Sequence, residues 1–309
     1  MTNEARVTSS DATATEWRVI RIDRGWSTLR NTENDDESRV RNIGAEVAVG
    51  DIVTMDGERV TSVLPRSSAI TRRRSGEGAR VQKDVIAANV DVVLVVQAAD
   101  QKVSPRRIER ELTVALDSLA APILVLNKCD LVLPSVLAER DEEVRRVSAG
   151  VPVHAVSATT KQGLGELIDG LPAGCAIALI GASGVGKSSL ANALSGSERQ
   201  TTGEVREGDQ RGRHTTTAAE LIPLSNGRWL VDTPGLRVVS LWLSGRGIER
   251  AFPEIFALAD SCKFRDCKHE SEPGCAVASA VQRGELDEKR LASMKELVAE
   301  EAELEELME

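Results

Sequence analysis

Hydrophobic and polar positions first predict a β-rich segment near the start of the chain. Apolar and polar residues alternate in residues 17–22 and 50–55, and similar short runs continue to about Arg74. The runs end at Gly, Asp or Asn, as short strands do. Asp56-Gly57 indicates a hairpin turn between two of these runs. Roughly five short strands in about 60 residues predict a small barrel, with OB and SH3-like barrels as the leading types.

From about Asp84 the pattern changes to apolar, β-branched runs that alternate with amphipathic stretches. The apolar runs predict buried strands at residues 90–96, 122–127, 151–156, 176–180 and 228–231. The amphipathic stretches predict helices at residues 105–119, 138–147, 163–171 and 187–194. Strands and helices in alternation are typical of a mostly parallel α/β sheet with helices on both faces.

Three segments show a different pattern. Residues 66–83 are rich in Arg and Lys and contain Gly76 and Gly78, which indicates a flexible linker or a charged surface. Residues 208–217 are polar and basic without apolar periodicity, so we expect a mobile loop. Residues 290–308 carry Leu and Met at helical spacing on an acidic background, and this helix could either pack on the body or await a partner.

Composition narrows the classes of protein that fit. A hydrophobic content of 41% is enough to build cores and excludes a fully disordered chain. The net charge of −9 argues weakly against nucleic-acid binding, but ten acidic and three basic residues between Glu285 and Glu309 account for −7 of it. The polar N-terminus and the lack of a long apolar stretch predict neither a signal peptide nor a membrane span, so we expect a cytoplasmic protein.

The strongest chemical signal is a phosphate-binding loop. Residues 181–188 fit the pattern G-x-x-x-x-G-K-[ST] between a predicted strand and a predicted helix, which is the context of a P-loop. Its glycines let the backbone wrap around phosphate oxygens. Lys187 would neutralise the β- and γ-phosphates, and Ser188 would ligate Mg²⁺. The expected nucleotide contacts here are Gly181, Ala182, Ser183, Gly184, Val185, Gly186, Lys187, Ser188 and Ser189.

A second pair of motifs predicts the choice of base. Asn127-Lys128-Cys129-Asp130 follows a predicted strand, and the carboxylate of Asp130 can accept both the N1–H and the N2–H of guanine. Adenine offers no such donor pair, so Asp130 would select guanine. Asn127 would brace the loop and Lys128 would cover the base. Ser157-Ala158 would offer a backbone N–H to guanine O6, although alone this pair is more typical of a helix N-cap.

The remaining nucleotide residues lie after the P-loop. Asp232-Thr233-Pro234-Gly235 follows a predicted strand, so Asp232 would coordinate Mg²⁺ through water and the N–H of Gly235 would meet the γ-phosphate. A threonine of residues 208–217 would complete the Mg²⁺ shell, and Thr216 is our choice over its neighbours. These strand-end motifs belong on one edge of one sheet, where such sheets bind ligands.

A cysteine and histidine cluster predicts a metal site. Cys262, Cys267, His269 and Cys275 offer three thiols and one imidazole, the full set for one closed, structural Zn²⁺ site. Cys129 and Cys175 are interpreted as bystanders, and His154 as a core or strand-end residue. The tryptophans are interpreted as packing residues, although Trp17 or Trp26 on the barrel could stack on bases.

The order of the motifs is permuted, because the guanine motifs precede the P-loop in this chain and follow it in ordinary GTPases. With the barrel and the Cys₃His cluster, this order resembles the ribosome small-subunit-dependent GTPase A family (RsgA, also called YjeQ). Residues 262–277 (CKFRDCKHESEPGCAV) are the most family-specific stretch. The resemblance implies a flexible N-terminus at 1–16, an OB domain at 17–80, a circularly permuted GTPase domain at 84–240 and a zinc-binding helical domain at 241–309.

The resemblance also implies a function. It predicts late maturation of the small ribosomal subunit, contact with its rRNA, and conversion of GTP to GDP and phosphate under stimulation by that subunit, with the protein acting as a monomer. Leu236 stands where Ras-like enzymes have a water-orienting Gln, and in this family the switch histidine, here His214, is the suspected substitute. The expected catalytic residues are His214, Lys187 and Thr216. One alternative is a GTP-gated binding or metal-handling regulatory protein that does not act on the ribosome, and a closed Cys₃His site disfavours metal delivery. The other is an ATPase, which Asp130 disfavours.

Overall fold

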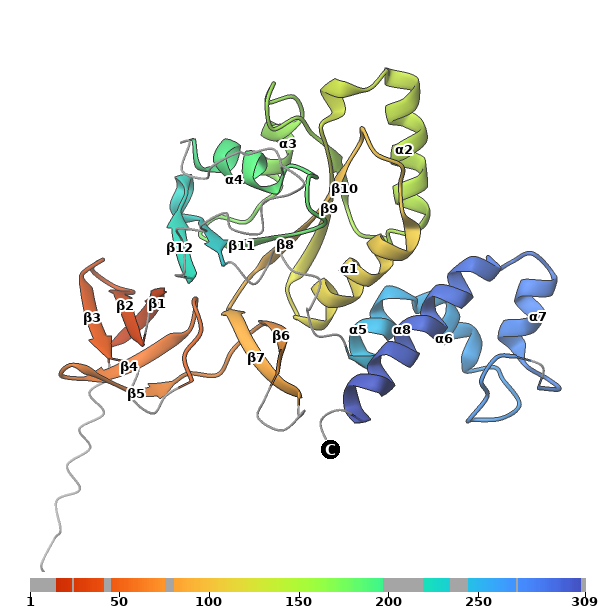
Figure 1. Cartoon of the computed structure of the whole chain (residues 1–309), viewed down its shortest axis with the longest axis horizontal. Coiled ribbons are helices and arrows are strands. Elements are labelled where there is room, and N and C mark those ends of the chain that lie inside the picture. The colour runs from red at the N-terminus through yellow and green to blue at the C-terminus, as the bar shows by residue number, and fades with distance from the viewer. Residues whose placement is uncertain are drawn as a thin grey trace, which may run out of the picture.

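The fold was analysed in a computed structural model that describes residues 15–23, 25–41, 46–75, 81–196, 219–233, 244–270 and 272–306. Figure 1 shows a small barrel, an α/β body and a group of C-terminal helices, with a two-stranded hairpin beside the barrel. None of the described helices is both long enough and apolar enough to span a membrane.

The predicted N-terminal barrel is confirmed. Its strands are β1 (Glu16–Asp23), β2 (Trp26–Asn31), β3 (Glu37–Arg41), β4 (Ile52–Asp56) and β5 (Arg59–Val63). They pair in the order β1-β2-β3-β5-β4, and β4 pairs back with β1 to close the barrel. Alternate residues point inward, so Val19, Leu29, Val40 and Val53 form the barrel core. The hairpin expected at Asp56-Gly57 joins β4 to β5.

The basic segment after the barrel is not a linker. β6 (Ala69–Ser75) and β7 (Val81–Ala88) pair antiparallel over seven residue pairs, from Ala69 opposite Ala88 to Ser75 opposite Val81. β-branched residues such as Ile70 and Ile86 bury the inner part of this hairpin in the main core. Of the two interpretations of this segment, the flexible linker is wrong for residues 69–75 and 81–83, because charged positions hid the strand alternation.

The α/β body contains the predicted parallel sheet. β10 (Val153–Ala155), β9 (Ala121–Asn127), β8 (Val92–Ala98), β11 (Ala176–Ile180) and β13 (Trp229–Asp232) lie side by side and parallel. The sequence did not predict β12 (Ala219–Pro223), which is antiparallel to β13 and also pairs with β1 of the barrel. The two sheets are thereby continuous in the described structure.

Helices cover both faces of this sheet, as predicted. α1 (Pro105–Asp117) and α2 (Pro134–Arg146) pack on the face that includes Val93 and Val95. α3 (Leu164–Asp169) and α4 (Lys187–Ser195) pack on the other face, against Leu94 and Val96. Because alternate residues of β8 serve both layers, that strand is apolar along almost its full length.

The C-terminal helices are α5 (Gly245–Ala251), α6 (Pro253–Ala259), α7 (Ala276–Gln282) and α8 (Glu288–Glu306), and α5 and α8 pack against α1 (Figure 1). The acidic helix α8 therefore folds back on the body, which answers the question that its sequence left open. Leu291, Met294 and Leu297 are buried in the main core. Its acidic groups pair with α1: Arg106 lies 2.6 Å from Glu296, and Arg110 lies 2.7 Å from Glu300.

Candidate functional site

The predicted nucleotide motifs lie at one edge of the parallel sheet. Asn127 ends β9, Ser157 and Ala158 follow β10, residues 181–186 join β11 to α4, and Asp232 ends β13. These strands are parallel, so all four motifs are at their carboxyl ends. This edge is where doubly wound sheets bind their ligands.

The P-loop takes a conformation that needs its glycines. Gly181, Gly184 and Gly186 have φ values of +143°, +82° and +92°. A Cβ on Gly181 would lie 2.4 Å from the carbonyl oxygen of Val96, and one on Gly186 would lie 2.3 Å from the amide nitrogen of Asn127. Larger residues would therefore both strain the backbone and collide with the strands beneath.

Lys187 lies folded over the loop that precedes it. Its ammonium donates to the carbonyl oxygens of Gly181 at 2.7 Å and Ala182 at 2.6 Å. Ser188 and Ser189 lie in the first turn of α4, and Val185 is buried beneath the loop. The loop thus keeps a positive charge at the N-terminus of a helix, where an anion is favoured.

Asn127 connects three of the predicted motifs. Its side-chain amide donates to the carbonyl oxygen of Val185 in the P-loop at 3.0 Å, and its side-chain oxygen accepts from the N–H of Ala158 at 3.1 Å. Asn127 is 1% exposed, so these bonds are shielded from water. The bracing contacts of this residue fit the role expected for it.

The other guanine residues occupy different environments. Asp130 is an exposed residue of the turn η2 (Cys129–Leu131), and its side chain has no hydrogen bond to the described part of the chain. The N–H of Ser157 donates to Gln162, and the Ser157 hydroxyl accepts from the N–H of Thr160, so its side chain caps a turn. The amides of Ser157 and Ala158 are both engaged within the protein, and their contact with guanine stays a prediction.

A polar pair beside the P-loop, made of a buried glutamine and a half-buried glutamate, was missed in the sequence. Gln97, 7% exposed, donates to the carboxylate of Glu111 on α1 at 2.6 Å. Burial raises the pKa of Glu111 to about 7, against the opposing effects of Gln97, Arg107 and Lys187. The signal that could have found this pair is the single Gln in the otherwise apolar strand β8.

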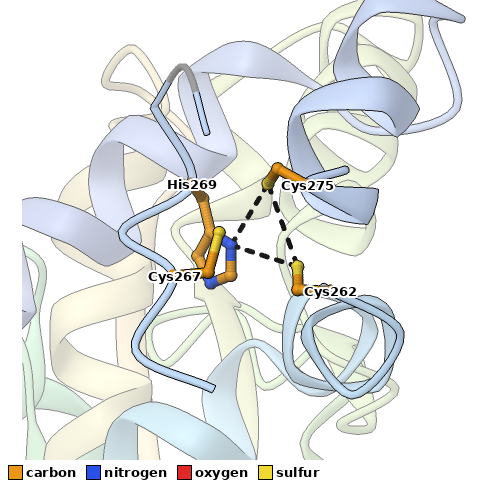
Figure 2. A group of neighbouring side chains, drawn as sticks. All are labelled: Cys262, Cys267, His269 and Cys275. Carbon is orange, nitrogen blue, oxygen red and sulfur yellow. Dashed lines mark hydrogen bonds between the residues drawn. The ribbon is translucent and has the colours of Figure 1, made fainter. Parts of the chain in front are cut away.

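The cysteine and histidine cluster has the dimensions of a zinc site. The four ligand atoms lie within 4.8 Å of one another, and Figure 2 shows them pointing toward one centre. The sulfurs of Cys262 and Cys275 are 3.9 Å apart, and each lies 3.6 or 3.5 Å from Nδ1 of His269. Tetrahedral Zn²⁺ with ordinary bond lengths requires roughly 3.8 Å between sulfurs and 3.6 Å between sulfur and nitrogen. The donor set and its spacing therefore fit one zinc ion.

Neighbouring groups hold the ligands in place. The carboxylate of Glu272 accepts from the N–H groups of Lys268 and Glu270, both at 2.8 Å, and those amides lower its pKa to about 2. The ammonium of Lys295 on α8 donates to the carbonyl oxygen of His269 at 3.0 Å. Burial and then the charge of Lys295 lower the pKa of His269, which favours the neutral imidazole that a metal requires.

Two of the three thiols, those of Cys262 and Cys275, face a helix N-terminus. Burial raises the pKa of the Cys262 thiol, but the backbone amides of Val277 and Ala276 outweigh it and the net pKa is lowered. Cys275 is the N-cap residue of α7, and its sulfur accepts from the N–H of Ala278. These amides favour thiolates, the form that binds zinc.

Several predicted residues have other outcomes. His214, Thr216 and Gly235 lie outside the described residues, so their roles stay predictions. Cys129 and Cys175 are buried away from the metal cluster, in agreement with their interpretation as bystanders.

Comparisons with known proteins agree with this architecture. The sequence profile of the family described as "RsgA GTPase" matches residues 63–242. Proteins named "Small ribosomal subunit biogenesis GTPase RsgA" from Methanosarcina acetivorans and Opitutus terrae are 42% and 45% identical to this chain. Each alignment covers 84% of this chain, and 71% and 68% of the respective relatives.

Two solved structures share the fold. The crystal structure of YjeQ from Thermotoga maritima is 26% identical, with a TM-score of 0.68 over 93% of this chain and 98% of that one. The structure of YloQ, described as a circularly permuted GTPase, is 22% identical, with a TM-score of 0.66 over 97% of this chain and 98% of that one. With the family profile covering more than half of the chain and relatives above 40% identity, this protein belongs to the RsgA GTPase family.

Proposed function

We propose that this protein is a GTPase that binds the small ribosomal subunit and acts late in its maturation, as a cytoplasmic monomer. Its relatives are named as small ribosomal subunit biogenesis GTPases. The observation that carries the proposal is the edge of the sheet where the P-loop meets Asn127, with Asp130 exposed beside it. A phosphate loop and a guanine-selective carboxylate at one edge are what GTP binding needs.

The nucleotide chemistry is assigned as follows. Lys187 would leave the carbonyl oxygens of Gly181 and Ala182 and pair with the phosphates, since its ammonium is already at the mouth of the loop. Bound Mg²⁺ would supply further neutralisation of phosphate charge, and Ser188, Thr216 and Asp232 are the residues expected to hold it. Leu236 cannot orient water, so hydrolysis by the isolated protein should be slow, with His214 as the proposed substitute.

The barrel supplies a surface that suits rRNA. Trp26 and Arg41 are opposite each other on β2 and β3, and the guanidinium carbons of Arg39 and Arg41 lie 5.3 and 5.0 Å from the Trp26 ring centre. Leu29 points into the core, so these residues are on the outer face, with Arg59 paired beside Arg41. Positive charge around an aromatic ring on strands 2 and 3 is typical of OB-folds that bind single strands.

These roles are divided among the three proposed segments. Residues 17–80 would contact rRNA, residues 84–240 would bind and hydrolyse GTP, and residues 241–309 would hold one structural zinc. The alternative of a metal-handling protein is disfavoured, because a closed four-ligand site does not release its ion readily.

The test is the rate of GTP hydrolysis with and without purified small ribosomal subunits. We expect slow hydrolysis alone and a large stimulation by subunits. His214→Ala should keep GTP affinity and lose stimulated turnover by on the order of 100-fold, as expected when a residue that orients or deprotonates water is removed. A wild-type rate that does not respond to subunits would overturn the proposed function, whereas unchanged turnover in the variant would remove only His214 from the mechanism.

A further inference from the structure

Lys128 has a backbone fixed from both sides. It is in the left-handed conformation with φ +63°, which is uncommon for a residue with a side chain. The preceding Asn127 is bonded to the P-loop, and the N–H of the following Cys129 donates to the carbonyl oxygen of Val156 at 3.1 Å. The backbone of Lys128 is therefore fixed, and only the torsion angles of its side chain decide where the ammonium lies.

One carboxylate holds the end of that side chain. The ammonium of Lys128 lies 3.0 Å from Oδ2 of Asp100, in the loop that follows β8. This loop is itself tied to the guanine motif, because the N–H of Ala99 donates to the carbonyl oxygen of Asn127 at 2.8 Å. The N–H of Gln101 closes a turn onto Ala98. Asp100 thus presents its charge from a fixed position.

The stem of Lys128 passes close to the P-loop. A Cβ built on Gly186 would be 3.9 Å from Cε of Lys128, so the end of the lysine stem runs beside the last glycine before α4. Asp130, the proposed guanine-selecting residue, is two positions further along the same turn. The stem therefore lies between the phosphate end and the base end of the proposed nucleotide site.

We propose that Asp100 is a positioning residue of the nucleotide site, which holds the Lys128 ammonium so that the lysine stem covers the nucleobase. This inference rests on the proposed binding of guanine nucleotides. A free lysine stem has several rotatable bonds, and ordering them on binding weakens affinity. Asp100 imposes that order before the nucleotide arrives, so it stabilises the complex through Lys128.

An ordinary surface ion pair would behave differently. The two side chains are 30% and 27% exposed, and a pair of this kind with no further role changes stability slightly and nucleotide affinity not at all. A positioning role predicts that the effect of Asp100 appears in nucleotide affinity and disappears when the Lys128 ammonium is absent.

The experiment is a double-mutant cycle on the full chain, with a fluorescent GDP and a non-hydrolysable GTP analogue as probes. Asp100→Asn should raise the dissociation constants of both nucleotides by the same factor, roughly three to five, because the base is common to them. In a Lys128→Met background, Asp100→Asn should have no further effect. Asp100→Glu, which keeps the charge, should bind within about twofold of the wild type.

The matched control is Asp141→Asn, which breaks the pair between Asp141 and Arg145 on α2, remote from the sheet edge. It should leave both affinities unchanged. Thermal unfolding of each variant without nucleotide checks that the fold is intact. Unchanged affinity in Asp100→Asn, an equal loss in the Lys128→Met background, or an Asp100→Glu variant as weak as Asp100→Asn would each overturn the inference. Wild-type protein that binds neither probe would instead refute the proposed function.

Discussion

The nucleotide edge and the cysteine and histidine cluster are assembled in different ways. At the nucleotide edge, loops that follow buried parallel strands are joined by protein hydrogen bonds, such as those from Asn127 to Val185 and from Ala158 to Asn127. In the cluster, three ligands lie on the irregular segment between α6 and α7, and only Cys275 belongs to a helix end. The first site is held by the sheet, whereas the described bonds around the second, such as those from Lys268 and Glu270 to Glu272, lie mostly within one irregular segment.

The two sites therefore owe their stability to different interactions: apolar burial for the nucleotide edge and metal binding for the cluster. The strands beneath the nucleotide edge bury apolar side chains on both faces, so the loops are placed whether or not a ligand is present. The cluster brings together three thiols that gain little from one another, and burial with the neighbouring thiols raises the pKa of Cys267 to about 11. Its geometry becomes favourable when a cation binds thiolates. Removing a ligand residue should therefore unfold one region and spare the other.

The largest effect should follow from Cys275→Ser. Structural zinc contributes about 10 kcal/mol or more in small zinc domains, and that free energy is folding free energy of the segment it joins. We expect loss of bound zinc and rapid amide hydrogen exchange across residues 260–282, with exchange in β8 and β11 unchanged. Native mass spectrometry gives the zinc stoichiometry, and hydrogen exchange gives the extent of unfolding.

Cys175→Ser is the matched control for that experiment. This buried cysteine lies outside the cluster, so the variant should keep one zinc per chain. Slow amide exchange in residues 260–282 of Cys275→Ser would mean that this segment stays folded without zinc. The proposed difference in stability between the two regions would then be wrong.

The next effect concerns the contact between the C-terminal helices and the GTPase body. Arg290 on α8 bonds to Glu109 of α1 at 2.8 Å, to Glu254 of α6 and to the carbonyl oxygen of Ala251, and its guanidinium stacks on Phe252. The side chain of Glu109 is only 3% exposed, so Arg290→Met would leave a buried charge without its partner. We expect a loss of about 3 to 5 kcal/mol in the free energy of unfolding, measured with urea.

Two further variants sharpen the meaning of that loss. Adding Glu109→Gln to Arg290→Met should recover much of the stability, since it removes the uncompensated charge. Arg283→Met breaks an exposed pair with Glu285 in the same region and should leave the free energy of unfolding almost unchanged. A small effect of Arg290→Met would mean that the two regions are joined by apolar packing alone.

Sequence reasoning succeeded where the signal is contiguous. The P-loop, the Asn127 motif and the cysteine spacing are short runs whose chemistry needs each residue type in order. The structure places Asn127 against the P-loop and the four metal-ligand candidates within 4.8 Å of one another, and their binding roles stay predictions. It missed the pairing of β6 with β7, because charged positions hide the alternation in this hairpin, and it missed β12, in which only Leu221 and Ile222 are buried. Pairs such as Glu109 with Arg290 join residues far apart in the chain, and no local pattern predicts them.

Lys187→Ala should show the opposite behaviour to the zinc-ligand variant. Removing the ammonium should weaken GDP binding on the order of 100-fold, or roughly 3 kcal/mol, because the phosphates lose a close charge partner. The stability of the nucleotide-free protein should change by less than about 1 kcal/mol, since the bonds from Lys187 to Gly181 and Ala182 join groups of a single loop. Calorimetric titration with GDP and urea unfolding without it measure the two quantities. If Lys187→Ala lowered the free energy of unfolding as much as it lowered the free energy of GDP binding, the view that the sheet alone holds this edge would be contradicted.

The smallest effect is the pH dependence that Glu111 gives to the nucleotide edge. Its pKa is about 7 in the folded protein, raised from 4.5 chiefly by burial, so between these values the folded state binds more protons than the unfolded state. Stability must then fall as pH rises from about 5 to 8. Glu111→Gln cannot titrate, so the wild type should lose about 1 to 2 kcal/mol relative to this variant over that interval, after allowance for partial exposure. Urea unfolding at several pH values measures the difference, and Glu139→Gln on the exposed face of α2 should run parallel to the wild type. A constant difference between wild type and Glu111→Gln from pH 5 to 8 would mean that Glu111 is charged throughout, and that the bond from Gln97 and the charges of Arg107 and Lys187 outweigh its burial.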